Sequence, residues 1–333
     1  MAVDVSVNWA TVAELFRPNA FVLVAAVILD LLLGDPVYGA HPVRLMGRSL
    51  TGLEKLLRAL KLDGYLGGCL LFVVLTCLWC GGLSLLALAL NYWNKWAGFV
   101  FQLFLLYSLI ALRDLLRHGW AVELAARKGS LPDTHCEISK LVGRDTERMD
   151  FAACRRAAIE SLSENLTDGF VSPIFWYAVA GFPGIVLFKV VSTMDSMVGY
   201  KTPQYLRFGW CGARLDDMLN WLPARVDWIM IALCASVLPG YSGAKALRIG
   251  WQQHGLIPGP NSGWSEASMA GAIQRRLIGQ IWRHGELVTD LWMGDPSDPP
   301  AGDDSDMRRT SLLVTMTGMA VTLLAIAVLV ATH

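Results

Sequence analysis

The sequence predicts an all-α fold in a polytopic integral membrane protein, with cytoplasmic helical segments and re-entrant hairpins. Hydrophobic residues make up 54% of the 333 residues and charged residues only 17%, which is too apolar for an ordinary soluble domain. Long apolar runs recur along the chain, and polar stretches rich in Gly and Pro separate them. These apolar runs predict the lipid bilayer as a partner. The formal net charge is zero, so we expect no binding of nucleic acid.

We predict that residues 1–112 form N-terminal transmembrane helices with a basic cytoplasmic loop at residues 35–65. Residues 21–33 are apolar over a length that suits a short or tilted span. Asp30 lies near one end of this run, where an acidic side chain either reaches water or has a function.

Two further spans complete this part of the chain. Residues 66–90 form a full span, and residues 97–112 return across the membrane after a short polar turn. Cys77 and Cys80 make a C-x-x-C pattern inside the first of these spans. Since neither a His nor a second Cys pair lies nearby in the sequence, we interpret both thiols as packing residues rather than a metal or redox site.

Residues 113–310 predict a cytoplasm-facing catalytic region, and residues 311–333 predict a C-terminal transmembrane helix. Two apolar segments inside the catalytic region, residues 170–191 and 226–244, are ambiguous. Gly and Pro residues interrupt both segments, so each either spans the membrane or dips into it as a re-entrant hairpin. Residues 294–306 predict a mobile acidic loop before the last span.

The distribution of Lys and Arg favours the re-entrant arrangement. Of the 28 Lys and Arg residues, 25 lie in residues 35–65, 113–169, 192–225 and 245–310. Cytoplasmic loops carry an excess of these residues. All 25 lie on one side if both ambiguous segments are re-entrant, whereas the four in residues 192–225 lie outside if both segments span. We therefore predict a multi-pass protein of the cell inner membrane, with its active site facing the cytoplasm.

The most densely charged part of the chain is residues 144–168. In a helix that begins near Phe151, Glu160, Glu164 and Asp168 share one face because they are four residues apart. Like charges at this spacing repel each other, which is tolerated when solvent screens the face or when a cation binds the carboxylates. Both interpretations remain open for this segment taken alone.

Two neighbouring residues refine the metal-binding interpretation. Arg156 is spaced to pair with Glu160, which leaves Glu164 and Asp168 for a divalent cation such as Mg²⁺. Gly169 stands where a C′ glycine commonly ends a helix, so we expect the helix to end there.

Two more polar clusters interrupt segments that are otherwise apolar. One combines Asp195 with Lys201, and the other has Arg214 followed by Asp216 and Asp217. Mg²⁺ is held by one or two carboxylates together with phosphates and water, so acids beside fixed cations suit a Mg²⁺–phosphate site. Each cluster alone is more often structural than functional.

A Gly- and Pro-rich loop at residues 259–263 precedes a predicted helix. Backbone N–H groups in such a loop, at a helix N-terminus, suit a phosphate, and Asn261 and Ser262 would line this anion cradle. We expect Ser262 or Ser265 as the N-cap and Glu266 in the first turn. The Walker A and Rossmann patterns do not occur, so a nucleotide site would not be of a familiar type.

These motifs occur in a characteristic order between residues 34 and 296: GDP…HPVRLMG, GRDTERMD, ESLSENLTDGFVSPIFW, STMDSMVGYK, FGWCGARLDDMLNWLPAR, GPNSGWSEASMAGA and HGE…WMGDP. The order resembles the adenosylcobinamide-phosphate synthases, the CobD/CbiB family of cobalamin biosynthesis. Ser192 and Ser265 depart from the Asn and Pro that are usual in that family, and the stretch between Gly279 and His284 is shorter.

The resemblance implies a membrane-bound carbon–nitrogen ligase with ATP and Mg²⁺ as cofactors. Such an enzyme joins a corrinoid, adenosylcobyric acid, to (R)-1-aminopropan-2-ol or its O-phosphate through an amide, giving adenosylcobinamide or its phosphate. Other membrane enzymes of the late cobalamin pathway are expected partners.

We assign roles in this reaction from the chemistry of the side chains. The carboxylates expected to hold the metal are Glu164, Asp168, Asp195, Asp216 and Asp217. The groups expected to hold the phosphates of ATP or of the amine are Arg144, Arg148, Lys201, Arg214, Asn261 and Ser262. The expected catalytic base is Asp145 or Glu266.

Two other classes of protein remain as alternatives. An AmpE-like, non-catalytic membrane signalling protein is disfavoured because the ENLTDG and DSMVGYK clusters are both retained. A membrane transporter is suggested by the interrupted segment 170–191. A transporter would place charged residues deep within several spans, where we identify only Asp30 and Lys189.

Overall fold

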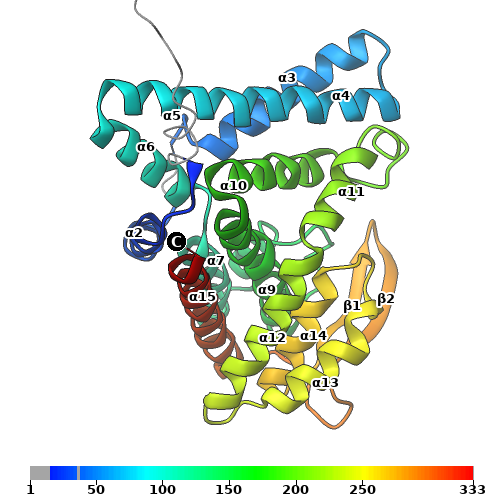
Figure 1. The fold of residues 1–333 in the computed structure, drawn as a ribbon. Coiled ribbons are helices and arrows are strands. Elements are labelled where there is room, and N and C mark those ends of the chain that lie inside the picture. The colour runs from blue at the N-terminus through cyan, green and yellow to red at the C-terminus, as the bar shows by residue number, and fades with distance from the viewer. Residues whose placement is uncertain (1–15, 36–37, 333) are drawn as a thin grey trace, which may run out of the picture. The chain divides into compact units, whose positions relative to one another are not determined.

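The computed structural model describes residues 16–35 and 38–332, and most of these residues are helical (Figure 1). The chain divides into two compact units that alternate along the sequence. The first unit comprises Met1–Ile110, Pro173–Asp216 and Leu324–His333. The second unit comprises Ala111–Ser172 and Asp217–Leu323.

The first unit begins with an apolar helix and a polar one, α2 (Ala20–Leu33) and α3 (Pro42–Ala59). Asn19 starts α2 by accepting hydrogen bonds from the backbone N–H groups of Phe21 and Val22, at 2.8 and 3.1 Å. Asp30, near the end of α2, is fully buried in the structure. Helix α3 lies within residues 35–65, the predicted basic loop.

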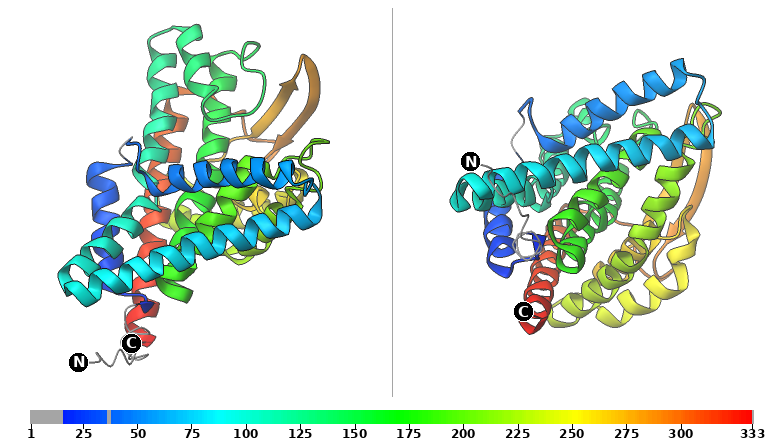
Figure 2. Two further views of the ribbon diagram at one scale, coloured as in Figure 1. Left: turned by 90° about the horizontal axis from the view of Figure 1, so that it is seen from above. Right: turned by 45° about the horizontal axis from the view of Figure 1, so that its top comes forward.

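A single long rod follows in the first unit. It consists of α4 (Tyr65–Thr76), the π-helical η1 (Cys77–Gly81) and α5 (Gly82–Trp93), and Figure 2 shows it as continuous. Asn94 ends α5 and caps α6 (Lys95–Ser108), because its side chain accepts the N–H of Trp96 at 2.8 Å. This cap forms the short polar turn that the sequence predicts.

The remaining helices of the first unit are most of α10 (Ser172–Val198) and of α11 (Trp210–Leu219). At Gly181 the backbone of α10 leaves the helical region, with φ 61° and ψ −149°. Such a positive φ strains any residue with a Cβ. Two residues later, Pro183 has no backbone N–H to donate to the helix. The predicted interruption of residues 170–191 is therefore present, and its re-entrant course stays a prediction.

The second unit packs helices around a buried centre. Its elements are α7 (Leu112–Arg127), α8 (Leu131–Ile138), α9 (Phe151–Leu166), η2 (Thr167–Val171), α12 (Trp221–Val237), α13 (Gly243–Gln253), η3 (His254–Leu256), α14 (Ser262–Ile273) and most of α15 (Asp304–Thr332). Gly119 lets α7 approach α9 closely, since a Cβ there would lie 2.7 Å from Leu162. Gly271 of α14 does the same against the backbone of α13.

A β-hairpin in the second unit is an addition to the predicted all-α fold. Strands β1 (Leu277–Arg283) and β2 (Glu286–Met293) pair antiparallel, with a bulge between Ile281 and Trp282. His284 and Gly285 form the two-residue turn, and both have positive φ, 52° and 80°. Such turns match the twist of antiparallel strands.

In the part of the chain that the structure describes, four helical stretches are long and apolar enough to cross a membrane: Tyr65–Trp93, Lys95–Arg127, Phe151–Val198 and Asp304–Thr332. A shorter apolar helix, Ala20–Leu33, adds to them. The mostly helical, polytopic membrane fold that the sequence predicts is confirmed.

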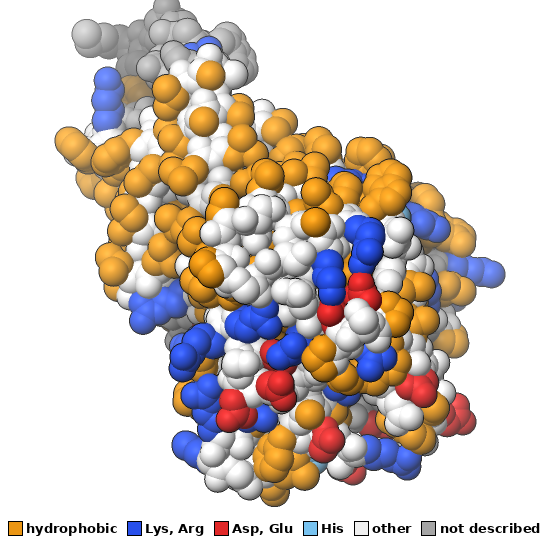
Figure 3. All heavy atoms as spheres, turned by 90° about the horizontal axis from the view of Figure 1, so that it is seen from below, with side chains coloured by type: hydrophobic (Ala, Val, Ile, Leu, Met, Phe, Trp, Pro, Cys, Tyr) orange, Lys and Arg blue, Asp and Glu red, His pale blue; other side chains and the backbone are white. Residues whose placement is uncertain are grey.

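Residues 294–306 differ from the predicted mobile loop, because ion pairs hold them to the helices of the second unit. Asp298 is bonded by Lys245 at 2.6 Å, and Asp295 by Arg248 at 2.5 Å. Asp306 is fully buried and accepts from Arg275 at 2.9 Å. Figure 3 shows acidic and basic side chains intermixed at the surface, as such pairs require.

Candidate active site

The ENLTDG motif lies where α9 passes into the π-helical turn η2 (Thr167–Val171). The prediction that Gly169 ends the helix is wrong, since the chain continues through η2 into α10. A π-turn contains one extra residue and disturbs the regular bonding of the helix. Here the carbonyl of Gly169 accepts the N–H of Ala111 at 3.2 Å instead.

Two buried side-chain pairs hold the ends of this turn. Thr167 Oγ1 donates to Asp227 Oδ2 at 2.6 Å, and Ser172 Oγ donates to Asn220 Oδ1 at 2.5 Å. Asp227, on α12, is completely buried. Asp227 is not among the predicted site residues, although an acid inside the apolar segment 226–244 is itself a signal of function.

Glu160 forms the buried ion pair of the site. Its Oε2 lies 2.5 Å from Arg144 Nη2, and both side chains are about 90% or more buried. Its Oε1 accepts the backbone N–H of Ile278 in β1 at 2.9 Å. Strand β1 and the loop before α9 therefore both meet α9 at this carboxylate.

The predicted pair between Arg156 and Glu160 is wrong for the described residues. Arg156 instead donates to the carbonyl oxygens of Ile278, at 2.9 Å, and Ala301, at 3.1 Å. The prediction rested on spacing within α9 alone, whereas the hairpin and the segment before α15 provide the acceptors that Arg156 uses.

Glu266 is a second buried carboxyl near the first. It lies on α14, is 6% exposed, and is close enough to α9 to feel the charges of Glu160 and Glu164. Burial raises the pKa of Glu266 well above its ordinary value, and the two negative charges raise it further. Arg144 opposes this effect. Glu160, Glu164, Glu266 and Arg144 therefore form one electrostatically coupled group.

The candidate metal ligands on α9 and η2 differ from Glu160 in exposure. Glu164 is exposed and Asp168 is partly exposed, so both reach solvent. Within residues 16–35 and 38–332, no group of three or more His, Cys, Asp or Glu side chains is arranged to hold a metal. Because Mg²⁺ needs only one or two protein carboxylates and takes its other oxygens from water and phosphates, this donor set fits it.

Asp145 and Glu266, the two predicted bases, have opposite surroundings. The carboxylate of Asp145 accepts the N–H groups of Gly285, at 2.8 Å, and His284, at 3.2 Å. The bond from Gly285 is the main reason that the pKa of Asp145 is lowered. A raised pKa makes a carboxylate a better proton acceptor, so these surroundings support Glu266 as the base more than Asp145, whose carboxylate is bonded to the hairpin turn.

The predicted anion cradle lies at the start of α14. The helix begins at Ser262 with Asn261 as its N-cap residue, so the expectation of Ser262 or Ser265 at this position is wrong. Asn261 donates to the carbonyl of Asp217 at 2.8 Å and accepts from Arg225 Nη1 at 2.9 Å. Arg225, which is not among the predicted site residues, therefore lies beside the predicted cradle.

Aromatic rings surround this end of α14. Trp264 stacks on His254, with ring centroids 3.8 Å apart, and lies 4.8 Å from Trp228. The guanidinium of Arg225 lies over the rings of Trp264 and Trp221 at 4.8 and 4.5 Å. These contacts fix Arg225 beside the loop.

The other predicted site residues divide between the two units. Arg148 lies in the second unit, over the ring of Trp282 at 4.3 Å. The first unit contains the remaining candidates, Asp195, Lys201, Arg214 and Asp216, while Asp217 belongs to the second. The structure therefore brings together the Arg144, Glu164 and Glu266 candidates within one unit.

Long apolar helices and a buried carboxylate–guanidinium group define a polytopic membrane protein with an ionisable centre. The chain belongs to the CobD/CbiB family, because the family described as "CobD/Cbib protein" matches residues 23–314. The resemblance that the motifs indicate is thereby confirmed.

Named relatives support the family assignment. The cobalamin biosynthesis protein CbiB of Salmonella choleraesuis (strain SC-B67) is 36% identical over 284 residues, which cover 83% of this chain and 88% of the relative. The cobalamin biosynthesis protein CobD of Yersinia enterocolitica is 37% identical over 302 residues, which cover 90% and 94%. That of Photorhabdus laumondii is 37% identical over 284 residues, covering 81% and 86%. No solved structure matches the chain.

Proposed function

We propose that this chain ligates adenosylcobyric acid to (R)-1-aminopropan-2-ol or its O-phosphate, with ATP and Mg²⁺, to give adenosylcobinamide or its phosphate. Family membership supports a role in cobalamin biosynthesis. The observation that carries the proposal is Glu266, a buried carboxyl beside the Glu160–Arg144 ion pair and the exposed Glu164.

Amide formation needs an activated acid and a deprotonated amine. ATP would supply the phosphoryl group that activates the corrinoid carboxylate, and Mg²⁺ would offset its charge. Glu266 is suited to accept the proton of the amine, because its burial makes its charged form costly. Arg144 forms its ion pair with Glu160, so we propose Glu266 as the proton acceptor of this group.

The remaining candidates keep their assigned tasks in this proposal. The carboxylates proposed to hold Mg²⁺ are Glu164 and Asp168, with Asp195, Asp216 and Asp217 as further ligands. The groups proposed to bind phosphates are Arg148, Lys201, Arg214, Asn261 and Ser262. Arg144, the other residue assigned to phosphate binding, forms an ion pair with Glu160 in the structure. We also propose that the site faces the cytoplasm and that other late-pathway membrane enzymes act beside it.

A direct assay tests the proposed reaction. The protein, reconstituted in lipid nanodiscs, is incubated with adenosylcobyric acid, ATP, Mg²⁺ and each amine, and the products are identified by mass spectrometry. We expect Glu266→Gln to lower the rate about a hundredfold or more, which is typical for loss of a general base. Glu137→Gln, a change at a half-buried surface ion pair on α8, is the matched control.

Absence of an amide product from wild-type protein with both amines would contradict the proposal. A signalling protein or a transporter would then explain the family membership better. Near wild-type turnover by Glu266→Gln would leave the reaction in place and remove Glu266 as the base.

A further inference from the structure

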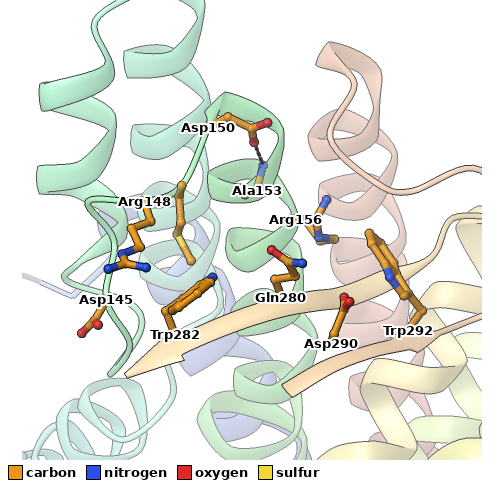
Figure 4. A pocket seen from close by; sticks show the side chains of 10 residues that line it. Asp145, Arg148, Asp150, Ala153, Arg156, Gln280, Trp282, Asp290 and Trp292 are labelled. Atoms are coloured by element: carbon orange, nitrogen blue, oxygen red, sulfur yellow. Dashed lines mark hydrogen bonds between the residues drawn. The ribbon is translucent and has the colours of Figure 1, made fainter. Parts of the chain in front are cut away.

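A pocket of about 300 Å³ lies between the hairpin and the N-terminal end of α9 (Figure 4). The side chains that matter for its chemistry are Arg148, Arg156, Gln280, Trp282, Asp290 and Trp292. All of them belong to the second unit. The pocket is separate from the carboxyl group of Glu266, which does not line it.

The register of the hairpin explains why these side chains face the pocket together. Gln280 pairs with Asp290 and Ile278 pairs with Trp292, and directly opposed residues share a face of the hairpin. Trp282, beyond the bulge, lines the same pocket. Figure 4 shows Gln280 and Asp290 between the two indole rings.

Both arginines rest on these rings. The guanidinium of Arg148 lies 4.3 Å from the centroid of Trp282, and that of Arg156 lies 4.9 Å from the centroid of Trp292. Arg156 uses Nε and Nη1 on backbone carbonyls, which leaves Nη2 without a hydrogen bond in the described part of the chain. A guanidinium held over an aromatic ring by cation–π attraction still presents N–H groups to an anion.

The acidic groups in the pocket are of two kinds. Asp145 and Asp150 already accept backbone N–H groups, from Gly285 at 2.8 Å and from Ala153 at 2.7 Å. The exposed side chains of Gln280 and Asp290 make no hydrogen bond within the described residues. The pocket therefore offers two cations for an anion, together with an acceptor and an amide for a ligand that also has donors.

We propose that this pocket binds a purine nucleoside polyphosphate through Arg148, Arg156, Gln280 and Asp290. An isolated phosphate would meet more acidic than basic side chains, whereas an adenine offers an amino donor to Asp290 and a ring nitrogen to Gln280. The indole and guanidinium surfaces suit a planar base. The inference rests on the proposed function, in which ATP is consumed, and locates its binding site.

Equilibrium binding to the full chain in detergent, measured by calorimetry, separates the two halves of the ligand. Arg148→Ala should raise the Kd for MgATP and for inorganic tripolyphosphate about tenfold or more, since both carry the phosphates. Asp290→Asn should raise the Kd for MgATP and adenosine and leave that for tripolyphosphate unchanged. Arg283→Ala, next to Trp282 but on the opposite face of β1, is the matched control and should bind all three as wild type does.

The outcomes distinguish this inference from the proposed reaction. If Arg148→Ala and Asp290→Asn bind MgATP as wild type does while amide formation still requires ATP, the pocket is not the nucleotide site and the reaction stands. If wild-type protein forms amide and binds no nucleotide, the ATP requirement itself fails. Weakened binding of adenosylcobyric acid with unchanged MgATP binding would also overturn the inference, because the pocket would then hold the corrinoid. Thermal unfolding confirms that each variant is folded.

Discussion

The guanidinium of Arg144 is the cation that lies near both Glu160 and Glu266 in the second unit. Arg144 forms its ion pair with Glu160, while Glu266 has neither an ion pair nor a hydrogen bond within the described residues. A buried carboxylate without a partner is costly, so a proton or a cation has to accompany Glu266. The exposed Glu164 carries no such cost. Residues that look alike in the sequence therefore have different chemistry in the fold.

Asp168 tests the metal-binding part of the proposal. Asp168→Asn keeps the shape of the side chain and removes one negative charge, so we expect loss of ATP-dependent ligation with partial recovery at high Mg²⁺. Initial rates across a Mg²⁺ titration measure this, and the melting temperature should stay close to that of wild type. Near wild-type turnover at low Mg²⁺ would move the metal to Asp195, Asp216 and Asp217.

Glu160 should behave differently from Asp168. Glu160→Gln leaves the buried Arg144 without its carboxylate, which costs about 3–5 kcal/mol of unfolding free energy when one partner of a buried pair is removed. Chemical denaturation in detergent measures the loss, with Glu137→Gln, at a half-buried surface ion pair, as control. An unchanged unfolding free energy would show that the ion pair contributes nothing to stability.

At the scale of elements, α9 was predictable and its continuation was not. The N-cap Asp150 and the fourfold spacing of acids indicate a helix from Phe151. A π-turn has no comparable sequence pattern, because its extra residue depends on partners such as Asp227 and Asn220 on a distant segment. The pairing of Glu160 with Arg144 was missed for the same reason.

The hairpin, in contrast, has a recognisable sequence pattern, although we predicted an all-α fold. Residues 277–283 and 286–293 are rich in aromatic and branched side chains, and His284–Gly285 separates them by two residues. The candidate base Asp145 turned out to hold this turn. Its role became visible only once the strands were placed.

The hairpin turn should depend on pH through Asp145. Its charged form accepts two N–H groups and its pKa is lowered, so ionised Asp145 stabilises the fold above the ordinary pKa of about 4. This stabilisation is lost as the pH falls through the lowered folded-state pKa. We expect the hydrogen-exchange protection of residues 284–291 to fall in that range and to lose this pH dependence in Asp145→Asn. Equal pH dependence in both proteins would contradict the assignment.

At the scale of the whole molecule, composition was a sufficient guide to the membrane class. The predicted spans 66–90, 97–112 and 311–333 fall within long apolar helices of the structure, apart from His333, which lies outside the described residues. The alternation of the two units along the chain was not foreseen. Hydropathy is a local quantity, whereas the grouping of distant segments depends on which faces pack together.

The predicted orientation is tested by cysteine labelling in a background that lacks the seven native cysteines. Single cysteines at Gln204 and Ser297, both exposed, should resist a membrane-impermeant maleimide in intact cells because we predict both on the cytoplasmic side. A cysteine at Tyr92, which is 91% exposed near the C-terminal end of α5, should label rapidly and serves as the positive control. Rapid labelling of position 204 would show that residues 170–191 span the membrane.

The π-turn η2 also sets the angular phase of the rod that continues from α9 into α10. One residue advances an α-helix by about 100°, so the extra residue in Thr167–Val171 rotates the residue that follows it by about that angle relative to an uninterrupted helix. Deleting one residue there would restore regular helical bonding and turn Ser172 away from its partner Asn220. The motif that presents the acids thus also sets the direction in which the next side chain points.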